Sequence, residues 1–317
     1  MDVFEHILQN CLDQDRKKIF VIYDDTTSSF LPALKKAGEL TGKRVSVGKI
    51  IEAGCHGEEP PYSIVEQMMV SDAVLCLTHY SLAHTSARNQ LTEKGIPFLS
   101  MPDYNSDMIN NPALLTNYEK TLPLVKKYSD ILSKGSVIKV YTELGTDLQL
   151  DITNRLGNCC PGLVNNEYLL GSPPDIEANV APIEEGSFGT LVIDGSITDY
   201  RIGLLSAPVE LKVVDGKIQS MQCSDENILS CVRGILDDVK SERAYYIGEL
   251  GIGFNEDATI CGNMLIDEGA RGCIHFGMGS NWTIGGKNKV AFHLDFVMKN
   301  ATVYVDNTKI IDRGVLL

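Results

Sequence analysis

The chain has few basic residues for its size and no long apolar run. Its 317 residues include 28 Lys and Arg against 42 Asp and Glu, which gives a formal net charge of −14. Nucleic acids and anionic membranes bind positive surfaces, so we expect neither as a partner. No stretch reaches the ~18 uninterrupted apolar residues of a membrane span, and the first residues lack the basic and apolar regions of a signal peptide. We therefore expect a cytoplasmic protein.

Two common cysteine and glycine motifs are also missing. The nine cysteines are scattered and none forms a Cys-x-x-Cys pair, which argues against a zinc knuckle or a redox dithiol. We expect all nine to be free thiols and none to bind a metal. No Gly-x-Gly-x-x-Gly follows the first predicted strand, so a dinucleotide site would lack its phosphate-binding loop.

Residues 1–133 alternate short apolar runs with amphipathic stretches, a pattern typical of strand-helix-strand units. Because the predicted strands are apolar throughout, they suit a parallel sheet that is covered on both faces. We therefore expect an α/β domain with a Rossmann- or flavodoxin-like parallel sheet. The predicted strands are Lys18–Tyr23, 44–50, Ala73–Leu77 and 96–101, and the predicted helices are 30–41, 64–70 and 81–94.

Residues 134–317 have a different pattern, which starts after a predicted connecting helix at 118–132. Short alternating strands are separated by Gly-rich turns, and residues 224–240 supply one clear helix. This pattern predicts an α+β domain with a large antiparallel sheet. Its predicted strands are Val137–Tyr141, 147–152, 190–193 and Val209–Val214, with more in 292–306.

The first candidate functional pair is His293 and Asp295, which lie two residues apart in the strand-like run Phe292-His293-Leu294-Asp295-Phe296. Side chains two residues apart on a strand point to the same face. An imidazole and a carboxylate on one face make a chelating pair for zinc, iron or manganese. A buried His-Asp hydrogen bond without a metal accounts for the pattern equally well.

Three more polar residues stand in apolar or Gly- and Pro-rich surroundings. His275 is followed by glycines that permit a close approach, although a core histidine bonded to a carbonyl is the usual explanation. Glu249 is the one charged residue of 247–255, and a buried carboxylate needs a cation nearby. Glu177 shares a Pro-rich turn with Asp175. Two histidines and three carboxylates suit one six-coordinate ion or a bridged pair, rather than a closed structural zinc.

These segments resemble the thermophilic aminopeptidase (aminopeptidase T) family of metallopeptidases, and more closely its shorter relatives labelled leucyl aminopeptidase. The resemblance covers most of the chain and extends to an Fe(II) ring-cleaving enzyme, 2,5-dihydroxypyridine dioxygenase. It rests on Glu249-Leu250-Gly251-Ile252-Gly253, Cys273-Ile274-His275-Phe276-Gly277 and His293-Leu294-Asp295, with Ser81-Leu82-Ala83-His84-Thr85-Ser86-Ala87-Arg88 and Met101-Pro102 in the N-terminal half.

The resemblance implies a centre of two divalent ions (zinc, manganese or cobalt) held by two glutamates, two histidines and an aspartate. Glu177 is selected by counting back from Ala181-Pro182, with Glu184 and Glu185 as rivals, because residues 172–177 depart from the family's Asn-Leu-Pro-x-Gly-Glu segment. Glu177 and Glu249 would also act in catalysis, beside the nucleophilic water. Carried onto this chain, the ligands are Glu177, Glu249, His275, His293 and Asp295.

A second polar cluster, His79, His84, Thr85 and Arg88, follows the strand Ala73–Leu77. Ligands collect at this edge of a parallel sheet, although polar residues at helix starts more often act as caps. We take His84 and Arg88 as candidates for substrate binding. Asn281 is a further candidate. We expect a small molecule or a short peptide as substrate, and a homodimer.

Three functions remain open. The first is a metal-dependent, aminopeptidase-like hydrolase that cleaves peptide or small amide bonds. The second is a mononuclear Fe(II) dioxygenase that needs only His275, His293 and Asp295. The third is a metal-binding relative without turnover. The chain lacks, in 278–282, the tyrosine of the longer peptidases and, after Asp267-Glu268, a lysine found in relatives. We therefore expect its peptidase activity to be weak or narrow.

Overall fold

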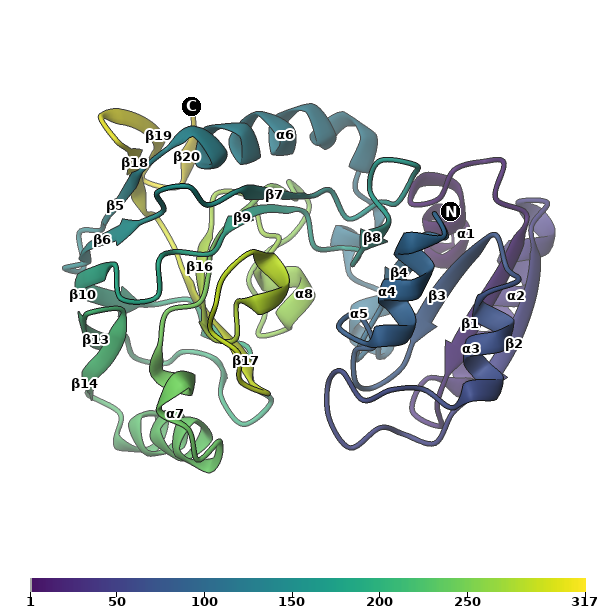
Figure 1. Ribbon diagram of the computed structural model, residues 1–317, viewed down its shortest axis with the longest axis horizontal. Coiled ribbons are helices and arrows are strands. Elements are labelled where there is room, and N and C mark those ends of the chain that lie inside the picture. The colour runs from purple at the N-terminus through teal and green to yellow at the C-terminus, as the bar shows by residue number, and fades with distance from the viewer. Residues whose placement is uncertain (1) are drawn as a thin grey trace. The chain divides into compact units, whose positions relative to one another are not determined.

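A computed structural model describes residues 2–317 of the chain, which divide into two compact units (Figure 1). The first unit comprises the residues up to Leu122 together with Cys160–Pro174, and the second comprises Pro123–Cys159 and Asp175–Leu317. The sequence predicts a single boundary at 133/134, and the observed division differs from it.

The difference has two local causes. The second unit begins inside the long helix α6 (Tyr118–Lys134) rather than after it. The chain then returns to the first unit because the short strand β8 (Leu170–Gly171) pairs in parallel with β4 (Phe98–Ser100). A two-residue strand flanked by turns carries too little periodicity to be predicted from the sequence.

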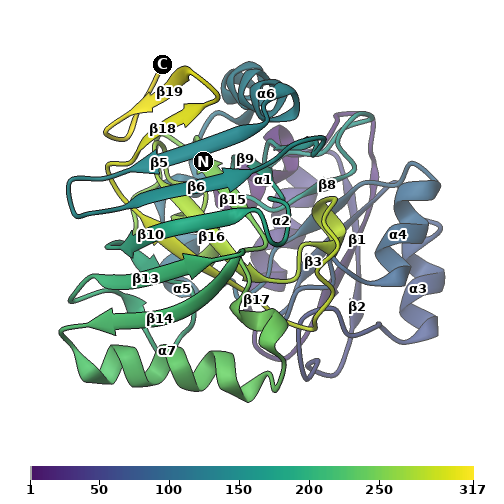
Figure 2. The ribbon, with the colours of Figure 1, turned by 60° about the vertical axis from the view of Figure 1, so that its left-hand side comes forward.

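The first unit is built on a parallel five-stranded sheet. Its order β2-β1-β3-β4-β8 starts with the 2-1-3-4 order of flavodoxin-like folds, as predicted. The apolar strands are buried between helices, with α1 and α2 on one side of the sheet and α3 and α4 on the other (Figure 2). The further strands are β1 (Lys18–Tyr23), β2 (Arg44–Lys49) and β3 (Ala73–Leu77), and the helices are α1 (Val3–Asn10), η1 (Ser28–Phe30), α2 (Leu31–Leu40), α3 (Tyr62–Met68), α4 (Ser86–Glu93), α5 (Ser106–Ile109) and η2 (Pro112–Leu115).

Helix α4 starts five residues later than predicted. Thr85 is its N-cap, and its hydroxyl accepts a hydrogen bond from the backbone N–H of Arg88 at 3.1 Å. The cap satisfies a backbone donor that would otherwise be orphaned at the helix start. Residues 81–84 therefore form a loop, and the capping explanation of Thr85 is the one that the structure supports.

The second unit is largely antiparallel sheet, as predicted, but its strands form two sheets rather than one. The orders are β14-β13-β10-β6-β5-β18-β19-β20 and β12-β11-β17-β16-β15-β9-β7. The eight-stranded sheet comprises β5 (Val137–Tyr141), β6 (Asp147–Asp151), β10 (Ser187–Ile193), β13 (Val209–Val214), β14 (Lys217–Cys223), β18 (Thr302–Val305), β19 (Thr308–Asp312) and β20 (Val315–Leu316). The seven-stranded sheet comprises β7 (Gly157–Cys160), β9 (Glu177–Val180), β11 (Ser196–Ile197), β12 (Gly203–Leu204), β15 (Leu250–Gly253), β16 (Ile274–Gly279) and β17 (His293–Met298).

The helices of the second unit after α6 are short apart from one. They are α7 (Glu226–Asp238), η3 (Glu242–Tyr245), α8 (Met264–Asp267) and η4 (Trp282–Ile284). No helix within residues 2–317 has both the length and the apolar character that crossing a bilayer needs. All nine cysteines are free in the structure.

Candidate metal centre

Four neighbouring strands of the seven-stranded sheet, β17, β16, β15 and β9, place polar residues on one face. Alternate side chains on a strand point to opposite faces, so apolar and polar positions separate cleanly. One face packs in the core with Ile176, Ala178, Val180, Leu250, Ile252, Ile274, Phe276, Met278, Leu294, Phe296 and Met298. The opposite face carries Glu177, Asn179, Glu249, Gly251, Gly253, His275, Gly277, Gly279, His293 and Asp295.

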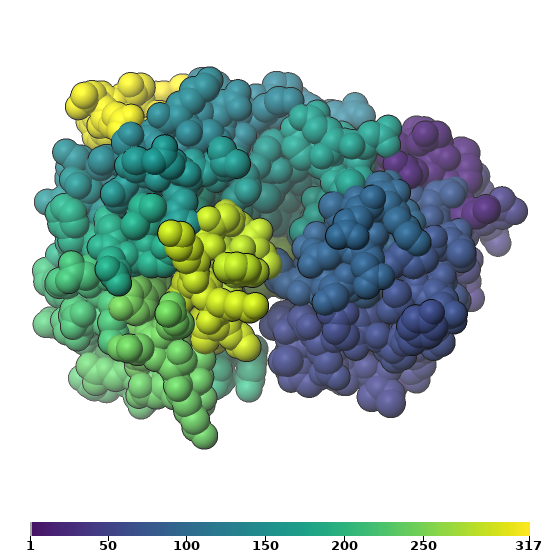
Figure 3. Space-filling view, in the orientation of Figure 1, coloured from purple at the N-terminus to yellow at the C-terminus, as the bar shows by residue number. Residues whose placement is uncertain are grey.

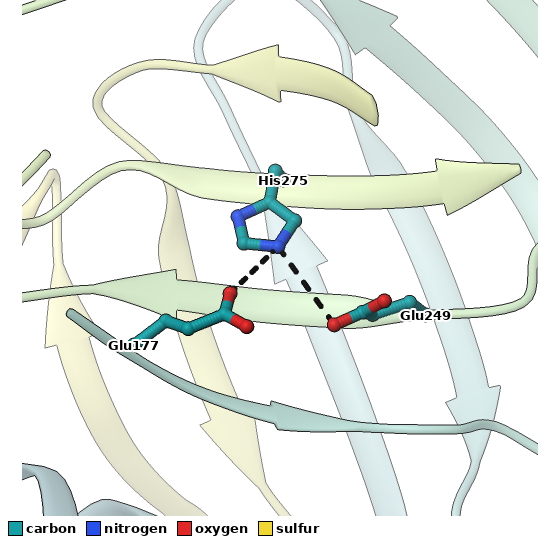
Figure 4. A group of neighbouring side chains, drawn as sticks. All are labelled: Glu177, Glu249 and His275. Carbon is teal, nitrogen blue, oxygen red and sulfur yellow. Dashed lines mark ion pairs between the residues drawn. The ribbon is translucent and has the colours of Figure 1, made fainter. Parts of the chain in front are cut away.

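Glu177, Glu249 and His275 form the first of two candidate metal-binding triads, drawn in Figure 4. His275 Nε2 lies 3.0 Å from Glu177 Oε2 and 4.0 Å from Glu249 Oε1. All three side chains are buried. They come from β9, from the residue before β15 and from β16, segments that pair side by side in the sheet.

Glu249, His293 and Asp295 form the second triad, so Glu249 belongs to both. His293 Nε2 lies 3.3 Å from Glu249 Oε2 and 3.1 Å from Asp295 Oδ1. His293 Nδ1 donates to the Ser280 carbonyl at 3.0 Å, which leaves Nε2 as the nitrogen that would bind a metal. The His293 side chain is 36% exposed while its two partners are buried. Solvent therefore reaches the second triad at His293.

Two glycines make room for the imidazole rings. Gly251 pairs with His275 across β15 and β16, and a Cβ at Gly251 would overlap His275 Cε1 and Nε2. A Cβ at Gly277 would lie 2.6 Å from His293 Nε2 and 3.0 Å from Glu249 Cβ. The sequence interpretation that glycines next to His275 permit a close approach is confirmed, and what approaches Gly277 is the other histidine.

The donor set fits a divalent ion in each triad. Glu177 Oε1 accepts from Asn179 Nδ2 at 2.6 Å, whereas Glu177 Oε2 is buried and, within residues 2–317, has no hydrogen-bond partner of suitable geometry. That oxygen faces His275 Nε2, and two acceptors that face each other need a cation or a proton between them. By the same criterion His275 Nδ1 also lacks a partner among the described residues.

Without metal, the pKa values of the ligand side chains are set by burial and by the charges of their close neighbours. Burial and the charge of Glu177 raise the pKa of Glu249 to about 7. Burial would lower the pKa of both histidines, but Glu177 raises the pKa of His275 to about 9 and Asp295 raises the pKa of His293 to about 10. Burial would likewise raise the pKa of Asp295, yet His293 and His275 hold it well below its usual range. Without metal, the two histidines therefore favour their protonated forms at neutral pH.

Two acids beside the triads, Asp175 and Glu268, were not among the predicted site residues. Burial first, and then the charges of neighbouring carboxylates, raise the pKa of both well above the usual range. Glu268 shares a hydrogen bond with Asp295, and Asp175 Oδ1 is buried without a partner within the described residues. Asp175 stands two residues before Glu177, which was the available signal. Glu268 is distant from the ligands in sequence, and its signal was the family resemblance of Asp267-Glu268.

The raised pKa values predict that metal affinity increases with pH. A metal needs neutral histidines and ionised carboxylates, and protons compete for His275 up to about pH 9 and for His293 up to about pH 10. Between pH 6 and 9 we expect the apparent affinity to rise by about tenfold per pH unit for each proton displaced. Calorimetry in buffers of different ionisation enthalpy would count the protons released. A flat affinity over this range would contradict the assigned protonation.

The three predicted substrate residues lie outside the triads. His84 and Arg88 belong to the first unit, where Arg88 Nε donates to the Ala83 carbonyl and Nη1 to Thr92 Oγ1 at 3.3 Å. Asn281 is buried in the loop before β17, and its side chain bonds Glu184 and the backbone of Asn288. These contacts give Arg88 and Asn281 structural roles, and substrate binding by the three residues stays a prediction.

Glu184 and Glu185, the two rivals of Glu177 as a metal ligand, lie outside the triads. Glu184 forms an ion pair with Arg155 at 2.7 Å, and Glu185 is exposed. Neither joins a triad among the described residues. Glu177 is therefore the glutamate of this segment that meets His275 and Glu249.

Residues 43–317 match the NicX family, described as 2,5-dihydroxypyridine 5,6-dioxygenase. The chain belongs to this family. Among solved structures, 2,5-dihydroxypyridine dioxygenase from Pseudomonas putida KT2440 is similar with a TM-score of 0.83 and 17% identity, over 99% of this chain and 96% of that one. Aminopeptidase T (AmpT) from Thermus thermophilus is similar with a TM-score of 0.74 and 14% identity, over 99% and 98% of the two chains. No curated protein sequence matches.

These matches confirm the resemblance and the fold class expected from the sequence. At such low identities the two solved structures share the fold with this chain, and a fold hosts more than one reaction. The family and both neighbours are named as enzymes, which supports an enzyme here. The two triads support metal binding.

Proposed function

We propose that the protein is a metal-dependent hydrolase that uses two divalent ions to cleave a peptide or a small amide bond. The observation that carries this proposal is the pair of triads that share Glu249. Glu177 and His275 would complete one ion position, and His293 and Asp295 the other. A carboxylate with an oxygen toward each position is the arrangement that suits a bridged pair of ions.

The distribution of the histidines supports two positions rather than one. A mononuclear iron site of the two-His-one-carboxylate type needs His275, His293 and Asp295 around a single point. In this chain each triad contains one histidine, and carboxylates complete both.

The bound ions would lower the pKa of a water molecule and polarise the substrate carbonyl. Glu177 and Glu249 would act beside that water. Burial and their acidic neighbours raise the pKa of Asp175 and of Glu268 well above the usual range. A raised pKa favours the protonated form of these two acids, which would then supply the proton donor that this chain otherwise lacks, since it has no tyrosine in 278–282 and no lysine after Asp267-Glu268. A substrate would approach at His293, the exposed ligand.

A second candidate is an Fe(II) ring-cleaving dioxygenase. The family match over residues 43–317 and the Pseudomonas putida structure favour it, since both are named for the cleavage of 2,5-dihydroxypyridine. One ion would then suffice, and Glu177 would orient ligands rather than bind metal. The predicted homodimer and the cytoplasmic location remain proposals under either function.

Metal content and oxygen dependence separate the two functions. We expect metal-free protein to bind two cobalt, manganese or zinc ions per chain and then to hydrolyse small aminoacyl amides or dipeptides without oxygen. Hydrolysis needs only an activated water, so removing oxygen should change nothing. Activity that appears only with one Fe(II) and dissolved oxygen, on a dihydroxylated pyridine ring, would replace the hydrolase proposal with the dioxygenase.

A further inference from the structure

Residues 280–292, called the hairpin loop below, join β16 to β17 and so link His275 to His293. Figure 3 shows part of this yellow-green segment at the surface, and Trp282 in it is 56% exposed. Its inner side is nevertheless ordered by two buried asparagines. The Asn288 backbone N–H donates to Asn281 Oδ1 at 2.7 Å, and the Asn281 N–H donates to the Asn288 carbonyl at 3.1 Å. The loop is thus a folded element with an exposed outer side.

One ion pair from other segments anchors the hairpin loop. Arg155 is 7% exposed, and its Nη2 donates to Glu184 Oε2 at 2.7 Å while Nη1 donates to the Gly285 carbonyl. The second carboxylate oxygen of Glu184 accepts from Asn281 Nδ2 at 3.2 Å and from the Lys287 N–H. Arg155 and Glu184 together therefore hold the loop at three residues.

The hairpin loop in turn contacts a ligand of the second triad. The Ser280 carbonyl accepts from His293 Nδ1 at 3.0 Å. The His293 side chain is 36% exposed, and this hydrogen bond restrains its ring on the side away from the carboxylates. Such a bond fixes the tautomer and the direction of the ligating nitrogen.

The same loop connects to the first triad through two asparagines. The Ile284 carbonyl accepts from Asn158 Nδ2 at 3.3 Å, and Asn158 Nδ2 also donates to Asn179 Oδ1 at 2.8 Å. Asn179 Nδ2 then donates to Glu177 Oε1 at 2.6 Å, which turns Glu177 Oε2 toward His275. A displacement of residue 284 would reach Glu177 through this chain of hydrogen bonds.

We propose that Arg155 and Glu184 are positioning residues: through the hairpin loop they orient one ligand of each triad, His293 and Glu177, and so couple the two metal positions. The proposal rests on the proposed two-ion centre and adds residues that touch no ligand themselves. An isolated buried ion pair contributes little net stability. This pair also binds three residues of one loop, so its main effect is to fix the conformation of that loop.

The test compares Arg155→Met with Tyr128→Phe, a matched control in the same unit. The Tyr128 hydroxyl donates to the Ile310 and Leu317 carbonyls, so its loss removes buried hydrogen bonds without touching the hairpin loop. Cobalt affinity and the visible Co(II) spectrum are measured by titrating metal-free protein, with no substrate. Melting temperature is recorded for each variant.

We expect Arg155→Met to lower the affinity for both cobalt ions by about 10- to 100-fold, as loss of outer hydrogen bonds does in metalloproteins. The Co(II) absorption bands should shift as well. Tyr128→Phe should lower the melting temperature and leave cobalt binding unchanged. Glu184→Gln should behave like Arg155→Met, and the double variant should be no worse than either single one. Arg155→Lys should restore part of the affinity, and it serves as the test if Arg155→Met does not fold.

Three results would overturn the proposal. The first is wild-type cobalt affinity in both Glu184→Gln and the Arg155 variant (Arg155→Met, or Arg155→Lys if Arg155→Met does not fold). The second is an equal loss of cobalt affinity in Tyr128→Phe. The third is a wild-type protein that binds only one cobalt ion. The hydrolase proposal fails separately, because two tightly bound ions without amide hydrolysis would contradict it and leave the positioning role intact.

Discussion

Replacing Glu249 with glutamine is expected to remove both metal ions at once. Glu249 is the one residue shared by the two triads, and a glutamine keeps its shape but loses the charge that both positions use. We expect each affinity to fall by more than the ~100-fold that loss of an outer hydrogen-bonding partner costs, and hydrolysis to disappear with the ions. Elemental analysis after dialysis checks the stoichiometry.

The fold should survive this change. The pKa of Glu249 is raised from 4.5 to about 7 by burial and by Glu177. Glu249 therefore destabilises the metal-free protein increasingly above pH 4.5 and fully above about pH 7, and glutamine relieves this cost. Glu185→Gln is the matched control, since Glu185 is exposed and close in sequence to Glu177. If Glu249→Gln still binds two ions per chain, the prediction that Glu249 is a ligand of both metal positions is wrong.

Replacing Gly251 with alanine is expected to empty the first position and leave the second. The added methyl group would overlap the His275 ring and lie 2.9 Å from Glu177 Oε2. Overpacking of this kind typically costs about 1–3 kcal/mol, and relief requires His275 to turn away from its triad. We expect one ion per chain instead of two, and a lower melting temperature.

Gly234→Ala provides the control for a glycine replacement in the same unit. Gly234 lies in helix α7, and a Cβ there would meet nothing within 4 Å. Because alanine is the better helix former, this variant should be stabilised by up to about 1 kcal/mol. Two ions and an unchanged melting temperature in Gly251→Ala would contradict the close packing of His275 against β15.

The regular elements could largely be predicted from the sequence because their patterns are local. The strands β1, β3, β5 and β13 have the predicted bounds, since apolar runs and strict alternation report burial directly. The start of α4 was misplaced because the cap at Thr85 is a matter of a single hydroxyl. The two-residue strand β8 was missed because its pairing with β4 comes from a distant part of the chain.

The ligand candidates were recognised for different reasons. His293 and Asp295 share a strand face, which period-two alternation alone predicts. Glu249 stood out as a carboxylate among apolar residues that needed a cation. Glu177 and His275 depended on a family resemblance, because a lone glutamate in a Pro-rich turn and a lone histidine in an apolar run have ordinary structural explanations.

The sequence by itself determined the two kinds of domain and the apolar and polar faces of the main strands, and with the family resemblance it gave five candidate metal ligands. Only the tertiary structure decided how those five divide, because the order β17-β16-β15-β9 sets which side chains become neighbours. It brought in Asp175 and Glu268, whose pKa values are raised by burial and by carboxylates from other segments. It also joined Arg155 to Glu184 under the hairpin loop. Hydrogen bonds and charges act between side chains that strand pairing brings together, and no local pattern records which segments will pair.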